Sequence, residues 1–157
     1  AIIMAEKAGW HTQVLTYEQQ GEASEVAKEH AAIALKLREQ GTKTLLFSGG
    51  ELTVTVKDAY GDGGPNQEYL LAMAIALNGT KGIRVLSCDT DGVDGSKDVA
   101  GGYIDEFTLK TAADKGLSPQ SYLDNHDSYN FLKEIETLII TGPTSTNVND
   151  FRVIMID

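Results

Sequence analysis

Polar, glycine-containing segments follow three apolar runs of the sequence, and they hold most of the side chains that could do chemistry. LLF leads into Ser48-Gly49-Gly50-Glu51, RVLSC leads into Asp89-Thr90-Asp91-Gly92, and LII leads into Thr141-Gly142-Pro143-Thr144. In open α/β sheets, ligands bind beyond the carboxyl ends of the strands, because loops and helix N-termini converge there. The three segments together predict a binding site, although each of them alone would be read as an ordinary tight turn.

The first of these segments has the composition of a phosphate cradle. Gly49 and Gly50 let backbone N–H groups approach an anion, because no Cβ stands in the way. Glu51 could act beside the ligand as a base or hold a metal-bound water, or it could be an exposed charge at the start of a strand. A second anion position is predicted where Asn66 and Glu68 begin an apolar helix, since the N-terminus of a helix favours negative charge.

Three carboxylates, those of Asp89, Asp91 and Asp94, lie within six residues of each other. Like charges this close repel unless a cation or a proton relieves them. Mg²⁺ with a phosphate ligand needs only one or two carboxylates, so we expect Asp89 and Asp91 to hold this metal. Hydroxyls and amides are also dense over residues 142–150, where they either orient a sugar acid or phosphate or form side-chain turns.

The pattern of apolar residues predicts the helices and strands that position these segments. Apolar residues recur at three- and four-residue spacings over residues 22–40, and residues 66–77 form a nearly all-apolar helix. Residues 89–102 are too polar and glycine-rich for a regular element. Other helices are expected over residues 2–8, 106–115, 119–123 and 128–135, and strands over residues 12–16, 43–47, 52–56, 83–87, 137–141 and 151–156. This order indicates a layered α/β/α domain with a mostly parallel or mixed sheet and binding loops at strand carboxyl ends.

Composition argues against several classes of protein. The 157 residues suffice for one domain with its own core, and the net charge of −10 argues against a nucleic-acid or anionic-membrane partner. No apolar run approaches the ~20 residues of a membrane span. Cys88 is the single cysteine and cannot form an internal disulfide, so we expect a cytoplasmic protein.

Several catalytic motifs do not occur in the sequence. It contains no GxxxxGK[ST], GxGxxG, GxSxG or HExxH. The three histidines, His11, His30 and His126, are scattered along the chain. His30 lies on a helix face, where a packed or half-exposed histidine is more typical than a catalytic one.

Six segments carry a resemblance to a known family, and they occur in the family's order between residues 48 and 156. They are SGGELTVTV (48–56), GDGGPNQEYLLAMAIAL (61–77), CDTDGVDG (88–95), AGGYID (100–105), NHDSYNFL (125–132) and TGPTSTNVNDFRVIMI (141–156). Together they resemble the MOFRL domain, the C-terminal part of the glycerate 2-kinase family, which includes enzymes named hydroxypyruvate reductase. By this resemblance residues 42–157 form the MOFRL-like domain, and residues 1–41 form the end of a preceding domain or its connection.

The resemblance implies a kinase that transfers the γ-phosphoryl group of ATP to D-glycerate, with Mg²⁺, in a cleft between two domains; 2-phosphoglycerate is the expected product. Its implied partners are glycerate and the N-terminal domain of the same enzyme, and a homodimer is possible. Many members have Arg where this chain has Pro65, so a phosphate-binding role at that position does not carry over. The residues that match motif positions, and so are candidates for the cleft, are Asp91, Asp94, Glu51, Asn66, Glu68, Thr141 and Asn147. The resemblance does not carry their individual roles. We expect the catalytic residues to be Asp91, Asp94 and Glu51, and the substrate- or nucleotide-binding residues to be Ser48, Gly49, Gly50, Asn66, Glu68, Thr141, Gly142, Thr144 and Asn147.

Two other functions stay open at this point. One is an NAD(P)H-dependent hydroxypyruvate reductase, against which the missing dinucleotide fingerprint counts. The other is a noncatalytic ligand-binding module. Because phosphoryl transfer needs groups on both sides of a closed cleft, we expect this chain alone to be inactive.

Overall fold

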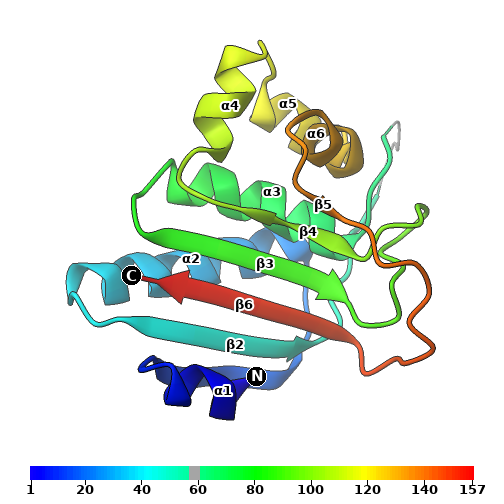
Figure 1. The fold of residues 1–157 in the computed structure, drawn as a ribbon. Coiled ribbons are helices and arrows are strands. Elements are labelled where there is room, and N and C mark those ends of the chain that lie inside the picture. The colour runs from blue at the N-terminus through cyan, green and yellow to red at the C-terminus, as the bar shows by residue number, and fades with distance from the viewer. Residues whose placement is uncertain (57–60) are drawn as a thin grey trace.

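A six-stranded mixed sheet with the strand order β1-β2-β6-β3-β4-β5 forms the centre of the computed structural model, which describes residues 1–56 and 61–157 (Figure 1). β1 and β2 are parallel, and β6 runs antiparallel to both of its neighbours, β2 and β3. The carboxyl ends of β1, β2 and β3 therefore meet the start of β6 at one edge. The strands are β1 (His11–Gln19), β2 (Thr44–Gly50), β3 (Ile83–Asp89), β4 (Gly101–Ile104), β5 (Leu138–Ile139) and β6 (Asp150–Ile156).

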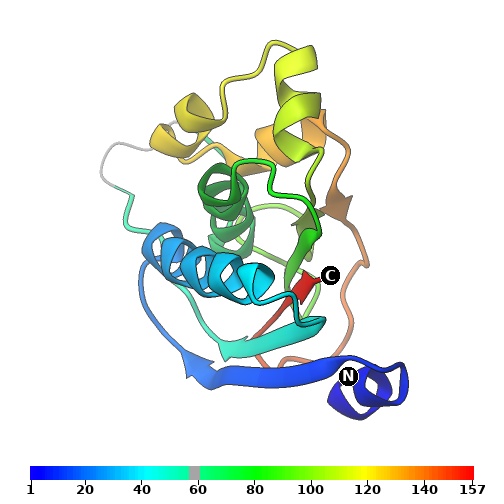
Figure 2. The same ribbon diagram turned by 90° about the vertical axis from the view of Figure 1, so that its left-hand side faces the viewer.

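Helices cover the two faces of the sheet unequally. On one face α2 (Ala23–Glu39) and α3 (Pro65–Leu77) pack side by side, and α4 (Thr108–Asp114), α5 (Pro119–Asp124) and α6 (Ser128–Glu134) lie on the far side of α3 (Figure 2). On the other face, α1 (Ile2–Lys7) packs against β1 and against Leu45 and Phe47 of β2 (Figure 1). The structure thus confirms the layered α/β fold class.

Helix α3 lies at the centre of the helical layer, which explains its composition. It contacts α2, β3, β4 and the three small helices, and ten of its 13 residues are buried. A helix surrounded by other elements has no solvent-facing stripe, so it is apolar nearly all round. It ends at Asn78, whose backbone is left-handed, as is common for the residue after a helix.

Two expectations about the sheet are wrong. Residues 52–56 do not form a strand: Thr53 makes a single bridge to Glu22, and the amide and hydroxyl of Thr55 donate to the Glu22 carboxylate at 2.8 and 2.9 Å. Within the loop predicted over residues 89–102, Gly101 begins strand β4. A Cβ on Gly101 would lie 2.1 Å from the carbonyl oxygen of Ser87, so glycine is there for close strand pairing.

The N-terminal residues share these layers. β1 pairs with β2 in the sheet, and α2 packs against α3. That residues 1–41 also form the end of a preceding domain stays a prediction. Among the described residues, no helix is both long and apolar enough to cross a membrane.

His30 on α2 is a packed histidine. It is buried, and its Nδ1 lies 2.9 Å from the hydroxyl of Tyr69, whose ring has the Arg152 guanidinium 5.8 Å from its centroid. Burial, and after it the positive charge of Arg152, lowers the pKa of His30 to about 4. Between pH 6.5 and 4 the unfolded chain therefore binds a proton that the folded chain does not, so stability falls as the pH falls.

We expect His30→Gln, which does not titrate, to remove this part of the acid sensitivity. For the wild type, proton uptake by unfolded His30 should lower the free energy of unfolding by about 2 kcal/mol between pH 7 and pH 5. Urea unfolding at both pH values measures this difference. His11→Gln, at an exposed histidine, is the control and should keep the wild-type pH dependence. An equal pH dependence in wild type and His30→Gln would contradict the account.

Candidate functional site

Two loops pack together at the edge where the carboxyl end of β3 meets the start of β6 (Figure 1). The hydroxyl of Thr90 donates to the carbonyl oxygen of Asn149 at 2.8 Å. The Thr144 amide donates to the carbonyl oxygen of Asp91 at 3.0 Å, and the Thr144 hydroxyl donates to that of Thr90 at 2.5 Å. The Asn147 side-chain amide donates to the Asp91 carboxylate at 3.2 Å. We call Asp89, Asp91, Thr141, Gly142, Thr144 and Asn147 the strand-end site.

Glycine allows the two loops to approach this closely. Gly92 has a φ of +96°, and a Cβ there would lie 2.2 Å from the carbonyl oxygen of Gly142 and 3.0 Å from the hydroxyl of Thr141. Any side chain at this position would push the loops apart. Beside the contact lies an open hollow of about 410 Å³, whose lining includes Asp91 and Asn147. Both side chains are therefore within reach of a ligand.

The two carboxylates of the strand-end site influence each other. Burial raises the pKa of Asp89, the negative charges of Asp91 and Asp150 add to this, and the backbone N–H of Asp91, 3.1 Å from Asp89 Oδ1, opposes it. Over residues 1–56 and 61–157, no group of three or more His, Cys, Asp or Glu side chains is arranged to hold a metal ion. Since Mg²⁺ can be held by two carboxylates and substrate phosphates, Mg²⁺ binding by Asp89 and Asp91 stays a prediction.

Asp94, the third of the clustered carboxylates, caps helix α3. It is 2% exposed, and it accepts hydrogen bonds from the backbone N–H groups of Asn66 and Gln67 at 3.1 and 2.9 Å. The side-chain amides of the same two residues add bonds of 3.2 and 2.9 Å. Burial raises the pKa of Asp94, and these hydrogen bonds oppose the rise.

The N-terminus of α3 is consequently not open to a ligand anion, which corrects the expectation from the sequence. Pro65 has no N–H group, the next two amides bond to Asp94, and the Glu68 amide donates to the carbonyl oxygen of Gly64 at 2.9 Å. The Asp94 carboxylate itself takes the place expected for the anion. Direct roles of Asp94 in catalysis and of Asn66 in ligand binding stay predictions, and the geometry gives both residues a structural role.

A buried network continues from Asn66 into the sheet. The Asn66 side chain donates to Asp150 at 2.7 Å and accepts from the Ser87 hydroxyl at 2.5 Å. Arg152, 1% exposed, donates to Asp150 at 2.6 Å and to Ser48 at 3.3 Å. The six residues of this buried network are Ser48, Asn66, Ser87, Asp94, Asp150 and Arg152.

Three members of the buried network were not predicted from the sequence: Ser87, Asp150 and Arg152. A signal for the last two exists in the strand pattern. Asp150 and Arg152 alternate in phase with Ile154 and Ile156, which are buried on the same side of β6. Two opposite charges on the buried face of a strand indicate a buried ion pair.

The glycines of the expected phosphate cradle belong to strand β2, which corrects the expected loop. Gly50 has a φ of +111°, and a Cβ there would lie 2.2 Å from the backbone nitrogen of Gln19. A Cβ on Gly49 would lie 3.2 Å from the carbonyl oxygen of Tyr17. Close approach of β1 therefore explains both glycines. Glu51 is exposed, and its side chain makes no hydrogen bond or ion pair with any described residue.

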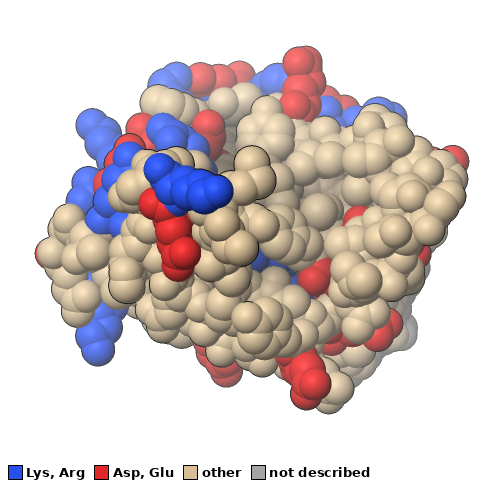
Figure 3. All heavy atoms as spheres, turned by 60° about the horizontal axis from the view of Figure 1, so that its bottom comes forward, with Lys and Arg blue, Asp and Glu red and all other residues tan. Residues whose placement is uncertain are grey.

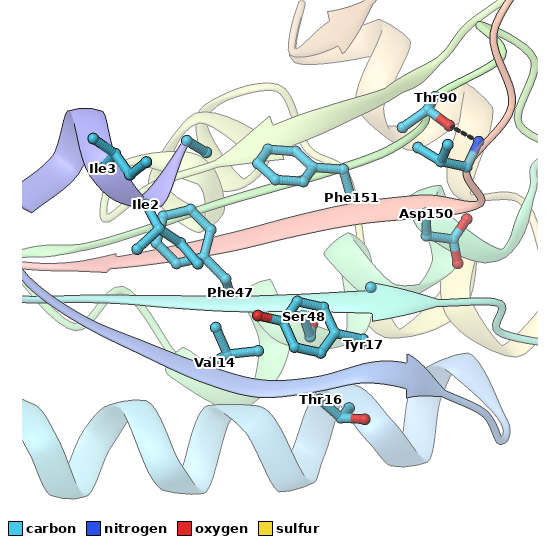
Figure 4. A pocket seen from close by; sticks show the side chains of 13 residues that line it. Ile2, Ile3, Val14, Thr16, Tyr17, Phe47, Ser48, Thr90, Asp150 and Phe151 are labelled. Atoms are coloured by element: carbon cyan, nitrogen blue, oxygen red, sulfur yellow. Dashed lines mark hydrogen bonds between the residues drawn. The ribbon is translucent and has the colours of Figure 1, made fainter.

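A larger hollow, of about 570 Å³, lies on the sparsely covered face of the sheet (Figure 4). Ile2, Phe47 and Phe151 make most of it apolar, and Thr90 and Asp150 lie at one end. Most of the surrounding surface is uncharged (Figure 3). This hollow suits an apolar group better than a phosphate, so the strand-end site is the better candidate for polar chemistry.

Glu68 lies outside the strand-end site. It lies in the first turn of α3, and its carboxylate pairs with His126 at 2.9 Å. None of its side-chain hydrogen bonds with described residues reaches the strand-end site.

We expect Asp94→Asn to destabilise the fold by about 2–3 kcal/mol, because the new amide would point a donor at groups that are themselves donors. Asp91→Asn is the matched control from the same loop. Since Asp91 is only half-buried, this variant should stay within about 0.5 kcal/mol of the wild type. Urea unfolding followed by circular dichroism measures both changes, and equal stabilities of the two variants would contradict the capping role.

Comparison with known proteins places this geometry in context. Residues 44–150 match the model of the MOFRL family. A D-glycerate 2-kinase from Thermotoga maritima is 43% identical over 154 residues, which cover 96% of this chain and 37% of the relative. A protein provisionally named hydroxypyruvate reductase, from Agrobacterium vitis, is 46% identical over 142 residues, which cover 87% of this chain and 37% of the relative.

A solved structure agrees over nearly the whole chain. The crystal structure of glycerate kinase from Thermotoga maritima superposes with a TM-score of 0.95 at 41% sequence identity, covering 99% of this chain and 38% of that protein. The chain thus spans less than two fifths of the length of the relatives that it matches.

Proposed function

This chain belongs to the MOFRL family, and on that premise we propose that it is the part of a glycerate kinase that positions the phosphates of ATP for transfer to D-glycerate. The observation that carries the proposal is the strand-end site. There the Asp91 carboxylate, the Thr144 hydroxyl and the Asn147 amide lie together, tied by hydrogen bonds between two loops, beside the carboxylate of Asp89.

The chemistry of these groups fits phosphoryl transfer. Catalysis of this reaction rests on positioning and on stabilising negative charge, with little covalent work for the protein. Hydroxyl and amide groups can donate hydrogen bonds to phosphate oxygens. Asp89 and Asp91 would hold Mg²⁺, which neutralises charge on the phosphates when it is bound. The proposal also includes Mg²⁺ and ATP, a cytoplasmic location and 2-phosphoglycerate as the product. It further includes an N-terminal partner domain and a homodimer.

A second candidate is an NAD(P)H-dependent hydroxypyruvate reductase, which the name of the Agrobacterium vitis relative favours. Dinucleotide-binding domains place the pyrophosphate at a helix N-terminus, where free amides receive it. In this chain the amides at the start of α3 are bonded to Asp94. The geometry therefore supports the kinase better.

Two coupled assays of the full-length protein separate these candidates. We expect phosphorylation of D-glycerate by ATP and no oxidation of NADH by hydroxypyruvate. NADH oxidation without kinase activity would replace the proposal with the reductase.

We also expect negligible turnover by the 157-residue chain alone, because half of a cleft cannot position both reactants.

We expect Asp91→Asn in the full-length protein to lower kcat about 10²-fold, since removing charge stabilisation of this kind costs about 3 kcal/mol. The loss should be measured at saturating Mg²⁺ with D-glycerate and ATP. Asp98→Asn, an exposed carboxylate of the same loop, is the matched control and should keep wild-type kcat. Equal kcat values for the two variants would remove Asp91 from the site.

A further inference from the structure

A hollow of about 260 Å³ lies at the start of α3, outside the strand-end site. Val54 and Val56 line it from one segment, and Gly61, Gly63 and Gly64 line it from another. Glu68 and His126 line this hollow and also a neighbouring one of about 490 Å³. Two titratable side chains therefore face space that a small molecule could enter.

The carboxylate of Glu68 is buried from solvent. Its side chain is 4% exposed, and its Oε2 lies 2.9 Å from Nδ1 of His126. Burial raises the pKa of Glu68, and the hydrogen bond and charge of His126 oppose this rise. The hydrogen bond to His126 is the only side-chain hydrogen bond that Glu68 makes with the described residues, so the pair forms a unit.

His126, which pairs with Glu68, has a left-handed backbone conformation. It lies between α5 and α6 with a φ of 50°, in the left-handed region that costs a residue with a side chain about 1–2 kcal/mol. Its amide donates to the carbonyl oxygen of Leu123 at 3.1 Å, which fixes the turn. The side chain is 25% exposed, and its Nε2 makes no hydrogen bond with any described residue.

This arrangement prepares an imidazole to accept a proton. When Nδ1–H donates to a carboxylate, the ring is fixed in the tautomer whose Nε2 carries the free lone pair. The carboxylate also stabilises the imidazolium that forms when Nε2 takes up a proton. A buried Glu68 and a partly exposed His126 have the geometry of such a pair.

We propose that His126, oriented by Glu68, is the general base for the hydroxyl of a small hydroxy acid that binds in the 260 Å³ hollow. The proposal rests on the proposed kinase function. The hydroxyl O–H bond breaks and its proton goes to Nε2, while the oxygen forms a bond to the γ-phosphorus of ATP. The bond from that phosphorus to the β–γ bridging oxygen breaks, and ADP leaves with the electron pair.

The loop after β3, which carries Asp91 of the strand-end site, also packs against the lining of the hollow. A Cβ on Gly64 would lie 2.5 Å from the side chain of Asp94, and a Cβ on Gly95 would lie 2.4 Å from the carbonyl oxygen of Gly63. The loop after β3 thus packs directly on the glycine segment that lines the hollow. His126 is the catalytic residue of the proposal and Glu68 the positioning residue.

The test is the pH dependence of kcat/KM for D-glycerate in the full-length protein. We expect wild-type activity to fall at low pH, because a general base must be unprotonated to accept the hydroxyl proton. His126→Asn tolerates a left-handed backbone and cannot act as a base, so its activity should be about 10²-fold lower and lack that fall. Asp124→Asn, which removes an exposed carboxylate from the neighbouring hollow, is the control and should keep wild-type activity and profile.

A second variant separates catalysis from a structural role. His126→Gly fits the left-handed backbone and leaves room for added imidazole, which should restore activity in proportion to its unprotonated fraction. A His126→Asn variant with wild-type activity would overturn the inference and leave the kinase function standing. Activity lost without a change in pH profile and without imidazole rescue would also overturn it, because the pair would then be structural. A wild-type protein that does not phosphorylate D-glycerate would overturn the proposed function itself.

Discussion

The carboxylate of Asp94 at the N-terminus of α3 is the contact on which the rest of the site depends. It receives four hydrogen bonds from the main chain and side chains of Asn66 and Gln67, and hydrogen bonds to a charged group contribute about 1.5–3 kcal/mol each. Through Asn66 the cap is joined to Asp150, and through Asp150 to Arg152 inside the sheet. The loop after β3, the central helix and the start of β6 are thereby fixed relative to one another.

This cap explains why the site differs from common phosphate-binding folds. In those folds a ligand phosphate satisfies the free amides of a helix N-terminus. Here the protein supplies its own anion, so a ligand must use other groups. The strand-end site offers Asp91 and Asn147, joined across two loops, and the hollow at the start of α3 offers Glu68 and His126. Under the proposed function the first pair serves the phosphates and the second serves the acceptor hydroxyl.

Much of the fold could be predicted from the sequence, because periodic burial is a local property. The helix over residues 22–40 follows from apolar spacing, the helix over residues 66–77 follows from its nearly all-apolar run, and the structure confirms them as α2 and α3. Glycine is harder to interpret, since Gly50 and Gly101 allow close strand packing where the sequence equally fits close approach of a ligand or a loop. The pairing of Asn66 with Asp150 could not be predicted, because the two residues are 84 residues apart along the chain. Only the fold decides which carboxylate caps a helix and which faces solvent.

The central claim is that Asp94 already satisfies the start of α3, and amide hydrogen exchange at Asn66 and Gln67 tests it most directly. Exchange should be followed by NMR with and without Mg²⁺ and a nonhydrolysable ATP analogue. The account predicts that both amides are as protected as the middle of α3 before ligand is added, and that the ligand leaves them unchanged. Fast exchange without ligand, followed by protection when the nucleotide is added, would contradict the account, because the helix end would then be a ligand site.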